Sequence, residues 1–505
     1  MVKNKLSISI SYPPLDTHKG TAFLSQNRQF QWTNTGNCIY PVIPAYAASL
    51  LQEHGYKVFW DDGIAEKLST EQWIQRILDR KPDVIVIESK TPTIKGYWKL
   101  IDRIREYETK SWQPTIVLMG DHLTGLPQES MENCKVDIVL TGGDYDFMLL
   151  NLMEHLSKGT ALEPGFYYRD NSGNIKNTGL YALKHHNLDT LPFIDRDLTQ
   201  WKLYAYNNGN YKYTPATYLM TGRDCWWGKC TFCSWTTIFP GKAFRFFTPK
   251  RTLAEVKHVV ENYGIREIFD DAGTLTPGAW IHEFTKGLVD TGLNKQVRYG
   301  ANMRFNAVGE REYAAMGEAR FRFMLYGLES SNQKTLDMLE KGTKTEDARK
   351  SLILAKKYGM EPHLTIMIGY PWETRQDAEN TLEEARRLFR DCLADSMQAT
   401  IVIPYPGTPL FKQCQENNWL LTEDWNDFDM RQAIMKCDMD TEELKALVQS
   451  LFKGVLTPKF LTKKVSSIRS VDDVKHLGSY AYKFIKKLSD FPVGTTAPVG
   501  SHTNP

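Results

Sequence analysis

The sequence has no long apolar run, no strong charge of either sign and no regular set of paired cysteines. No segment approaches the roughly 18 consecutive apolar residues of a membrane-spanning helix. A formal net charge of +2 over 505 residues argues against a dedicated nucleic-acid-binding protein. The basic start of the chain precedes too short an apolar run for a signal peptide. We therefore expect a cytoplasmic globular protein of two or three domains.

Cysteines are few, and most of them stand alone. Five of the eight fit small buried side chains in a reducing compartment better than disulfides. These five are Cys38, Cys134, Cys392, Cys414 and Cys437. The other three, Cys225, Cys230 and Cys233, lie within nine residues in the stretch TGRDCWWGKCTFCSW. Three thiolates without a fourth neighbour leave one coordination position of a metal site open.

Residues 1–165 alternate short apolar runs with amphipathic segments, which is typical of a parallel sheet covered by helices. The strands are predicted at 5–11, 56–60, 83–89, 115–120 and 137–143, with a helix at 43–55. Ligands of doubly wound sheets bind beyond the carboxyl ends of the strands. Two of these ends carry the small or polar residues Gly120, Asp121, Gly142 and Gly143. They fit either a ligand that approaches the main chain closely or a simple turn.

A second alternating pattern follows a predicted linker at residues 166–214, which includes a polar hairpin. Residues 215–420 contain six strand and helix repeats, which predict a curved, partly closed parallel barrel. The strands are predicted at 216–220, 265–270, 296–302, 321–327, 362–369 and 397–404, and the helices at 252–264, 279–292, 309–318, 332–358 and 375–391. The cysteine loop follows the first of these strands, so it opens onto the carboxyl face of the barrel.

Three kinds of site could use the cysteine trio. A structural zinc ion needs four ligands, and neither His258 nor His282 has a suitable spacing to the trio. A redox pair of Cys230 and Cys233 would leave Cys225 unexplained. An iron–sulfur cluster is bound by soft thiolates and, with only three of them, keeps one iron free for an external ligand. The cluster fits the pattern best.

Further motifs follow the other strands of the barrel in order. They are FDDAGTLT (269–276), NMRFN (302–306), YGLESSNQKTLDMLEKGT (326–343), GYPWET (369–374) and PYPGTPLF (404–411). Together with the cysteine trio, whose last member follows the aromatic Phe232, they resemble the cobalamin-binding subfamily of radical S-adenosylmethionine enzymes. The resemblance extends from about residue 40 to about residue 425 and so covers both alternating regions.

This resemblance implies a [4Fe–4S] cluster on the three cysteines, with Phe232 beside them and S-adenosylmethionine on the fourth iron, where it is cleaved to a 5′-deoxyadenosyl radical. The first interval of the trio, residues 226–229, is one residue longer than is usual in the family. The loop must therefore bulge by one residue, which Gly228 could absorb. The two tryptophans of the interval would form either a lid over the cluster or a wall of the substrate cavity.

The resemblance also implies how S-adenosylmethionine is held. Asp270 or Asp271 would bind the ammonium group, and Arg304 would bind the carboxylate. Glu329 and Ser330 would contact the ribose and methionyl parts. Independently of the family, a zwitterionic ligand needs an anion near its amine and a cation near its carboxylate. An internal ion pair at the barrel mouth is the alternative for Arg304 and Glu329.

The N-terminal region resembles the cobalamin-binding domain of the same enzymes. Residues expected beneath the corrin or along its nucleotide tail are Gly120, Asp121, Gly142 and Gly143. The segment DTHKG (16–20) is one residue short of the Asp-x-His-x-x-Gly motif of domains that ligate cobalt through histidine. We therefore interpret His18 as an ordinary loop residue, which agrees with base-off cobalamin in radical enzymes of this type.

Residues 421–505 follow the last of these motifs. We expect a small helical region there, from the amphipathic segment 441–456, and a disordered tail at its end. Its lysines fit a solvated helical face packed on the barrel, and contact with a membrane surface is the alternative.

The expected protein is thus an α/β protein with a doubly wound, Rossmann-like cobalamin domain, a partial (β/α)6 barrel and a helical C-terminal region. The resemblance implies an oxygen-sensitive C-methyltransferase that acts on an unactivated carbon of a small-molecule or lipid-like substrate. Its electron donor would be a flavodoxin or ferredoxin. The alternatives are a radical enzyme that forms a C–C bond or closes a ring in a tetrapyrrole or lipid, and a cobalamin-binding sensor with a structural iron site.

Overall fold

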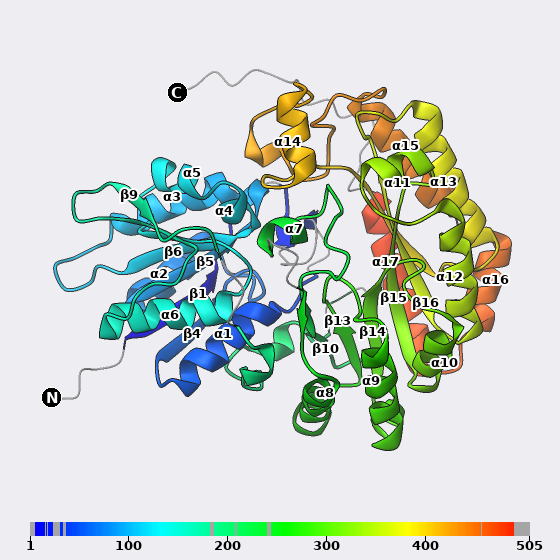
Figure 1. The fold of residues 1–505 in the computed structure, drawn as a ribbon, viewed down its shortest axis with the longest axis horizontal. Helices are drawn as coiled ribbons and strands as arrows, with labels where there is room; N and C mark the ends of the chain where they lie inside the picture. Colours follow the sequence, from blue (N-terminus) through cyan, green and yellow to red (C-terminus); the bar gives the residue numbers. More distant parts are fainter. Residues whose placement is uncertain are drawn as a thin grey trace.

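Two large sheets, one mostly and one wholly parallel, lie side by side in the computed structural model, with the short helix α7 (Trp235–Ile238) between them (Figure 1). The structure describes residues 6–15, 17, 19–23, 31–33, 37–181, 186–206, 208, 210–239, 244–455 and 457–488. Within these residues, every helix is too short or too polar to cross a membrane.

The N-terminal sheet has seven strands in the order β4-β1-β5-β6-β7-β8-β9. They are β1 (Ser7–Tyr12), β4 (Lys57–Asp62), β5 (Val84–Ser89), β6 (Thr115–Gly120), β7 (Ile138–Leu140), β8 (Phe166–Arg169) and β9 (Ile175–Asn177). The first five are parallel and confirm the five predicted strands. The predicted polar hairpin forms β8 and β9: β8 pairs antiparallel with the open edge of β7 and covers it, and β9 pairs antiparallel with β8. The segment 166–214, expected as a linker, therefore begins inside this sheet.

Helices cover both faces of the N-terminal sheet. They are α1 (Val42–Glu53), α2 (Thr70–Arg80), α3 (Ile94–Arg105), α4 (Asp121–Gly125), α5 (Pro127–Asn133) and α6 (Tyr145–Lys158), and a small hairpin of β2 (Thr21–Phe23) and β3 (Gln31–Thr33) follows β1. Alternate residues of β5 enter two different cores. Val86 packs in the core that contains α1 and α6, whereas Ile87 packs in the core that contains α2 and α3. This double burial explains why the strand reads as a continuous apolar run.

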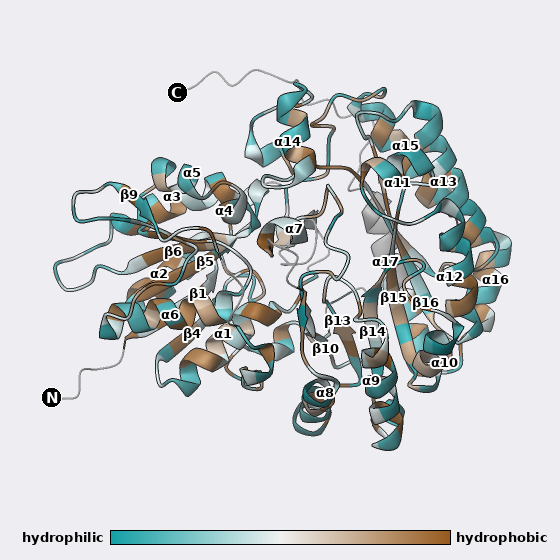
Figure 2. Cartoon of the chain, viewed as in Figure 1, coloured by the Kyte–Doolittle hydropathy of each residue, from teal (hydrophilic) through white to brown (hydrophobic). Residues whose placement is uncertain are grey.

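The second sheet has six parallel strands in chain order and curls into a half-barrel (Figure 1). They are β10 (Ala216–Leu219), β13 (Glu267–Asp270), β14 (Arg298–Met303), β15 (Phe321–Glu329), β16 (Glu361–Ile368) and β17 (Ser396–Ile401). Its helices are α8 (Pro249–Tyr263), α9 (Ala279–Asp290), α10 (Glu310–Glu318), α11 (Gln333–Met338), α12 (Thr345–Lys357) and α13 (Arg375–Arg390). All six predicted strands are confirmed. Figure 2 shows hydrophobic strands behind largely hydrophilic outer helices, so the half-barrel buries one side of each helix.

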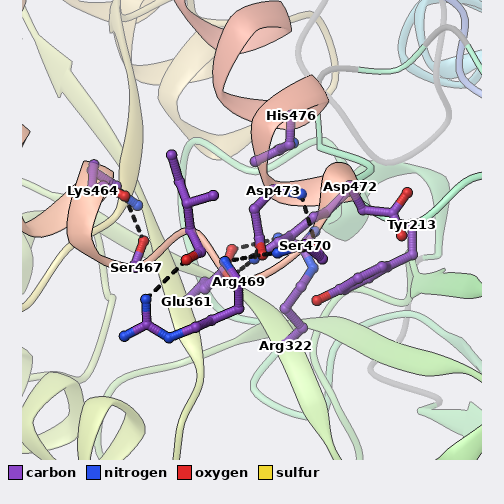
Figure 3. A network of polar contacts seen from close by, with 12 residues as sticks. Tyr213, Arg322, Glu361, Lys464, Ser467, Arg469, Ser470, Asp472, Asp473 and His476 are labelled. Atoms are coloured by element: carbon purple, nitrogen blue, oxygen red, sulfur yellow. Dashed lines mark hydrogen bonds and ion pairs between the residues drawn. The ribbon is translucent and has the colours of Figure 1, made fainter.

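Helix α14 (Pro409–Glu416) follows β17, and helices α15 (Thr441–Gly454), α16 (Pro458–Ser466) and α17 (Val471–Leu488) form the C-terminal region. Asp473 of α17 lies 2.6 Å from Lys212, which also lies 3.0 Å from Glu361 at the start of β16. Arg322, at the start of β15, lies 2.6 Å from the same glutamate (Figure 3). Lys464 of α16 pairs with Asp395 at 2.7 Å, which supports the expected helical face packed on the barrel.

This network lies at the amino-terminal ends of the half-barrel strands. The carboxyl end of the strands is left for ligands. The expected disordered tail, residues 489–505, lies outside the described residues.

Candidate active site

The cysteine loop lies at the carboxyl edge of the half-barrel. After β10, the chain forms β11 (Gly222–Arg223), which pairs antiparallel with β12 (Arg245–Phe246). The three cysteines lie between these two short strands and just before α7. The structure therefore brings the loop to the face predicted from the sequence.

Burial raises the pKa of all three thiols. Cys230 and Cys225 raise the pKa of Cys233 further, because the three thiols lie near one another. The cations of Lys341 and Arg304 act in the opposite direction on Cys230. Such a site keeps the thiols neutral until a metal displaces their protons.

Among the described residues, no group of three or more Cys, His, Asp or Glu is arranged to hold a metal ion. In an iron–sulfur cluster each thiolate binds a different iron, so its ligands stand further apart than those of a single ion. The three thiols are half-buried neighbours, and the resemblance implies a cluster on them.

The four-residue interval forms a bulge that carries two tryptophans. Gly228 has a φ of 54°, in the left-handed region that glycine adopts without strain, as expected for the extra residue. The indole nitrogen of Trp227 donates a hydrogen bond to the carbonyl oxygen of Glu340 at 2.8 Å. The guanidinium carbon of Arg304 lies 4.3 Å from the centre of the Trp227 ring and 5.3 Å from that of Trp226. Trp227 is thus anchored to the main chain and to a cation.

Asp270 at the end of β13 is occupied by protein donors. Its carboxylate accepts hydrogen bonds from the main-chain nitrogen of Thr221 at 3.0 Å and from the Thr221 hydroxyl. It also accepts from the main-chain nitrogen of Ala272 at 3.2 Å and from the Tyr299 hydroxyl at 3.1 Å. Thr221 begins the stretch that carries the cysteines, so Asp270 ties the cysteine loop to β13.

The next residue, Asp271, has a different environment. It is buried, and the amide nitrogen of Asn302 lies 3.4 Å from its Oδ1 atom. Arg304 is 8% exposed, and its Nη2 atom donates to the carbonyl oxygen of Lys341 at 2.6 Å. Burial lowers the pKa of Arg304, whereas the nearby cysteine thiols raise it. These contacts place Arg304 beside the cysteine loop.

Glu329, the last residue of β15, has a φ of 59° and forms a buried ion pair with Lys341 at 2.8 Å. Glu329 thus forms an internal ion pair, the alternative given for it, and its partner is Lys341. The hydroxyl of Ser330 donates to the carboxylate of Glu373 at 2.8 Å. Burial raises the pKa of Glu373 to about 7.

At the carboxyl edge of the N-terminal sheet, Gly120 has a φ of 139°, and a Cβ atom there would collide with the carbonyl of Ser89. The carboxylate of Asp121 forms an ion pair with Lys90 at 2.9 Å, with both side chains buried. The structure thus gives Asp121 a protein partner. His18 lies outside the described residues, so its interpretation as an ordinary loop residue stays a prediction.

Gly142 and Gly143 follow β7, where the two domains meet. A Cβ atom on Gly142, whose φ is 82°, would overlap the ring of Tyr181. One on Gly143 would overlap Ile238 and Phe239, in and just after α7. The glycines thus allow protein segments to approach closely, and their contact with a corrin stays a prediction.

A buried ionic network, which the sequence analysis did not identify, joins the two domains. Asp144 accepts hydrogen bonds from Arg223 at 3.1 Å, from Arg245 at 2.5 and 3.0 Å, and from His186 at 2.8 Å when that nitrogen is protonated. Asp146 accepts a hydrogen bond from Arg223 at 2.6 Å. Burial lowers the pKa of His186, but hydrogen bonds to carboxylates, first that of Asp144, outweigh it and raise the pKa to about 9.

The network connects the two predicted cofactor regions. Asp144 follows the Gly142-Gly143 pair, and Arg223 precedes Cys225 by two positions. The sequence indicated that both residues are near a cofactor site, since Asp144 adjoins the glycine pair and Arg223 adjoins the cysteine trio. It could not reveal the pairing, because the two residues are 79 positions apart.

Several buried polar atoms around the cysteine loop have no hydrogen-bond partner in the described part of the chain. They are Trp226 Nε1, Thr274 Oγ1, Arg304 Nε, Tyr370 Oη and Glu373 Oε2. The charges of Glu329 and Cys230 contribute to the raised pKa of Tyr370, so its hydroxyl lies near the cysteine loop. Buried polar groups are nearly always hydrogen-bonded, so atoms of this kind fit a polar ligand that completes the site.

The comparisons with known proteins agree with this geometry. The model of the Radical SAM superfamily matches residues 219–385. An uncharacterised methyltransferase of Pyrococcus horikoshii is 29% identical over 84% of this chain and 90% of its own length. Anaerobic magnesium-protoporphyrin IX monomethyl ester cyclase of Rubrivivax gelatinosus is 26% identical over 82% of this chain and 73% of its own length.

The solved structure of the cobalamin-dependent S-adenosylmethionine radical enzyme OxsB, with aqua-cobalamin and S-adenosylmethionine bound, is similar over nearly the whole chain. The TM-score is 0.69 over 97% of this chain and 72% of that one, at 16% identity. Residues 219–385 are therefore a radical SAM domain, and the whole chain has the fold of a cobalamin-dependent radical SAM enzyme.

Proposed function

We propose that this chain is a cobalamin-dependent methyltransferase that places a methyl group on an unactivated carbon of a small-molecule or lipid-like substrate. The observation that carries the proposal is the contact between the carboxyl edges of the two sheets. Helix α4, after β6, packs against α7. Gly125 also lies against the main chain of Pro406, which follows β17. Because ligands bind beyond the carboxyl ends of parallel strands, the cofactors of the two domains would face one shared space.

The proposed cofactor contacts follow from the geometry and the resemblance together. The cluster would be bound by Cys225, Cys230 and Cys233, with Phe232 beside them. S-adenosylmethionine would contact Asp271, Arg304, Glu329 and Ser330. Cobalamin would contact Gly120, Asp121, Gly142 and Gly143. When bound, the cluster with S-adenosylmethionine supplies a hydrogen-abstracting 5′-deoxyadenosyl radical, and cobalamin supplies the methyl group.

The chain's own residues prepare this site. The ammonium of Lys341 pairs with Glu329 and offsets part of the rise that burial causes in the pKa of Cys230, which favours the thiolate form that binds metal. Asp270 holds the start of the cysteine loop through its hydrogen bonds to Thr221. Burial of these groups excludes water, which strengthens each electrostatic contact with a ligand.

Ring closure or another C–C bond formation is the second candidate. It is favoured by the similarity to the Rubrivivax gelatinosus cyclase over 82% of this chain. The similarity to the Pyrococcus horikoshii methyltransferase covers more of the relative, 90% against 73%, and supports methyl transfer. Both candidates begin with the 5′-deoxyadenosyl radical acting on the substrate, and they differ in whether a methyl group is transferred.

Labelled S-adenosylmethionine separates the candidates. The reconstituted protein is incubated without oxygen with substrate extracts, a reduced flavodoxin or ferredoxin and S-adenosylmethionine that carries a deuterated methyl group. A product heavier by the labelled methyl group, absent with the Cys230→Ala variant, supports the proposal. Formation of 5′-deoxyadenosine with an unlabelled cyclised product supports ring closure. Bound cobalamin without any cleavage of S-adenosylmethionine would instead indicate a sensor and overturn both.

A further inference from the structure

The two consecutive tryptophans of the cysteine loop have different roles in the structure. Their rings are nearly perpendicular, with an interplanar angle of 85° and centres 6.3 Å apart. The indole N–H of Trp227 donates a hydrogen bond to the carbonyl oxygen of Glu340. The Trp227 ring lies against Gly342, where a Cβ atom would not fit. The indole nitrogen of Trp226 is buried and has no partner among the described residues. Only Trp226 therefore has a donor to offer a ligand.

A second buried donor lies next to it. Arg304, whose guanidinium carbon is 5.3 Å from the centre of the Trp226 ring, donates from Nη2 to the protein but has no described partner for Nε. The guanidinium keeps its positive charge in proteins, so the pair offers two N–H groups and one full charge. The chemistry that satisfies both donors is an anionic oxygen group such as a carboxylate.

The position of Arg304 indicates which ligand carries that carboxylate. The guanidinium carbon of Arg304 lies 4.3 and 5.3 Å from the ring centres of Trp227 and Trp226, which directly follow Cys225, so the cation lies beside the loop of the proposed cluster ligands. A group bound there contacts the cluster region directly. A substrate would have to stand further off, beyond the cofactor that attacks it.

We propose that Trp226 is a ligand-binding residue whose indole N–H acts with Arg304 Nε–H on the carboxylate of S-adenosylmethionine. The inference rests on the proposed function, because it needs S-adenosylmethionine at the cluster. The proposed role of Trp226 explains the longer interval of the cysteine loop. The extra residue allows Trp227 to anchor the loop while Trp226 contacts the ligand.

The test uses the full-length, anaerobically reconstituted protein and the substitution Trp226→Phe, which removes the N–H and keeps an aromatic ring. Equilibrium dialysis measures the affinity for S-adenosylmethionine and for decarboxylated S-adenosylmethionine, which lacks the carboxylate. Iron and sulfide analysis checks the cluster. The matched control is Trp112→Phe in the N-terminal domain, which loses a hydrogen bond of its indole nitrogen to the carbonyl oxygen of Pro82.

We expect Trp226→Phe to weaken S-adenosylmethionine binding about tenfold or more, as for the loss of one hydrogen bond to a charged group. Binding of the decarboxylated compound should be the same in wild type and variant, and Trp112→Phe should change neither affinity. Equal weakening of both compounds, or a variant that binds both as wild type does, overturns the inference. If the wild-type protein with a full cluster binds neither compound, the proposed function fails instead.

Discussion

Replacing Asp270 and Asp271 separately by asparagine should separate anchoring of the cysteine loop from ligand binding. In the folded protein the two oxygens of Asp270 accept hydrogen bonds from four donors, two on Thr221, one on Ala272 and one on Tyr299. Asparagine offers a single acceptor oxygen and an amide that donates, so at least one buried donor loses its acceptor. Each such loss costs about 1–3 kcal/mol, a large part of the 5–15 kcal/mol of a typical domain.

The Asp271→Asn substitution removes a charge and keeps the shape. If Asp271 binds the ammonium group of S-adenosylmethionine, the lost charged hydrogen bond is worth roughly 1.5–3 kcal/mol, or about one to two orders of magnitude in Kd. Stability and cluster content should stay close to wild type. The Asp270→Asn protein should instead unfold at lower urea concentration and retain less iron, because Thr221 leads into the cysteine loop.

Three measurements made without oxygen check this pair: urea unfolding, iron and sulfide content, and the Kd for S-adenosylmethionine. The reverse pattern, with Asp270→Asn stable but weak in ligand binding, would refute the assignment of the two roles. Near-wild-type binding and 5′-deoxyadenosine formation in both variants would mean that the ammonium group is held elsewhere.

Three further substitutions test other parts of the site. Cys230→Ala should abolish iron–sulfur absorbance and 5′-deoxyadenosine formation, whereas Cys414→Ala should not, and full activity of the first variant would contradict the cluster assignment. Asp144→Asn leaves buried cations without their shared carboxylate and should lower the free energy of urea unfolding by about 3–5 kcal/mol. It should also lower the pKa of His186 from its value of about 9, as measured by NMR titration. An unchanged pKa of His186 would contradict the role of Asp144 in this network. Burial raises the pKa of Glu373 to about 7, so below that pH its carboxyl group is neutral in the folded protein, whereas it is ionised in the unfolded chain above about pH 4.5. The free energy of unfolding of the wild type should therefore fall by roughly 3 kcal/mol relative to that of Glu373→Gln as the pH rises from about 4.5 to 7. Parallel pH profiles of the two proteins would refute this.

The sequence alone determined the strands, the order of the two sheets and the candidate cluster ligands. Alternation of apolar strands with amphipathic helices is a local signal, because each strand buries both faces and each helix only one. The cysteine trio is equally local. Its spacing fixes three soft ligands within one loop, and its place after β10 fixes the edge of the half-barrel at which the loop opens.

Only the tertiary structure decided which polar groups pair with one another. It joined the hairpin of β8 and β9 to the open edge of β7, which the linker assignment had missed. It gave Glu329 the partner Lys341 and joined Arg223 to Asp144 across the two domains. It also distinguished Asp270 from Asp271, although the two are adjacent in the sequence. The partners of buried charges come from other segments, 12 positions away for Glu329 and 79 for Arg223, and they meet only after the chain has packed. The periodicity of a strand or helix, in contrast, is fixed within a few residues.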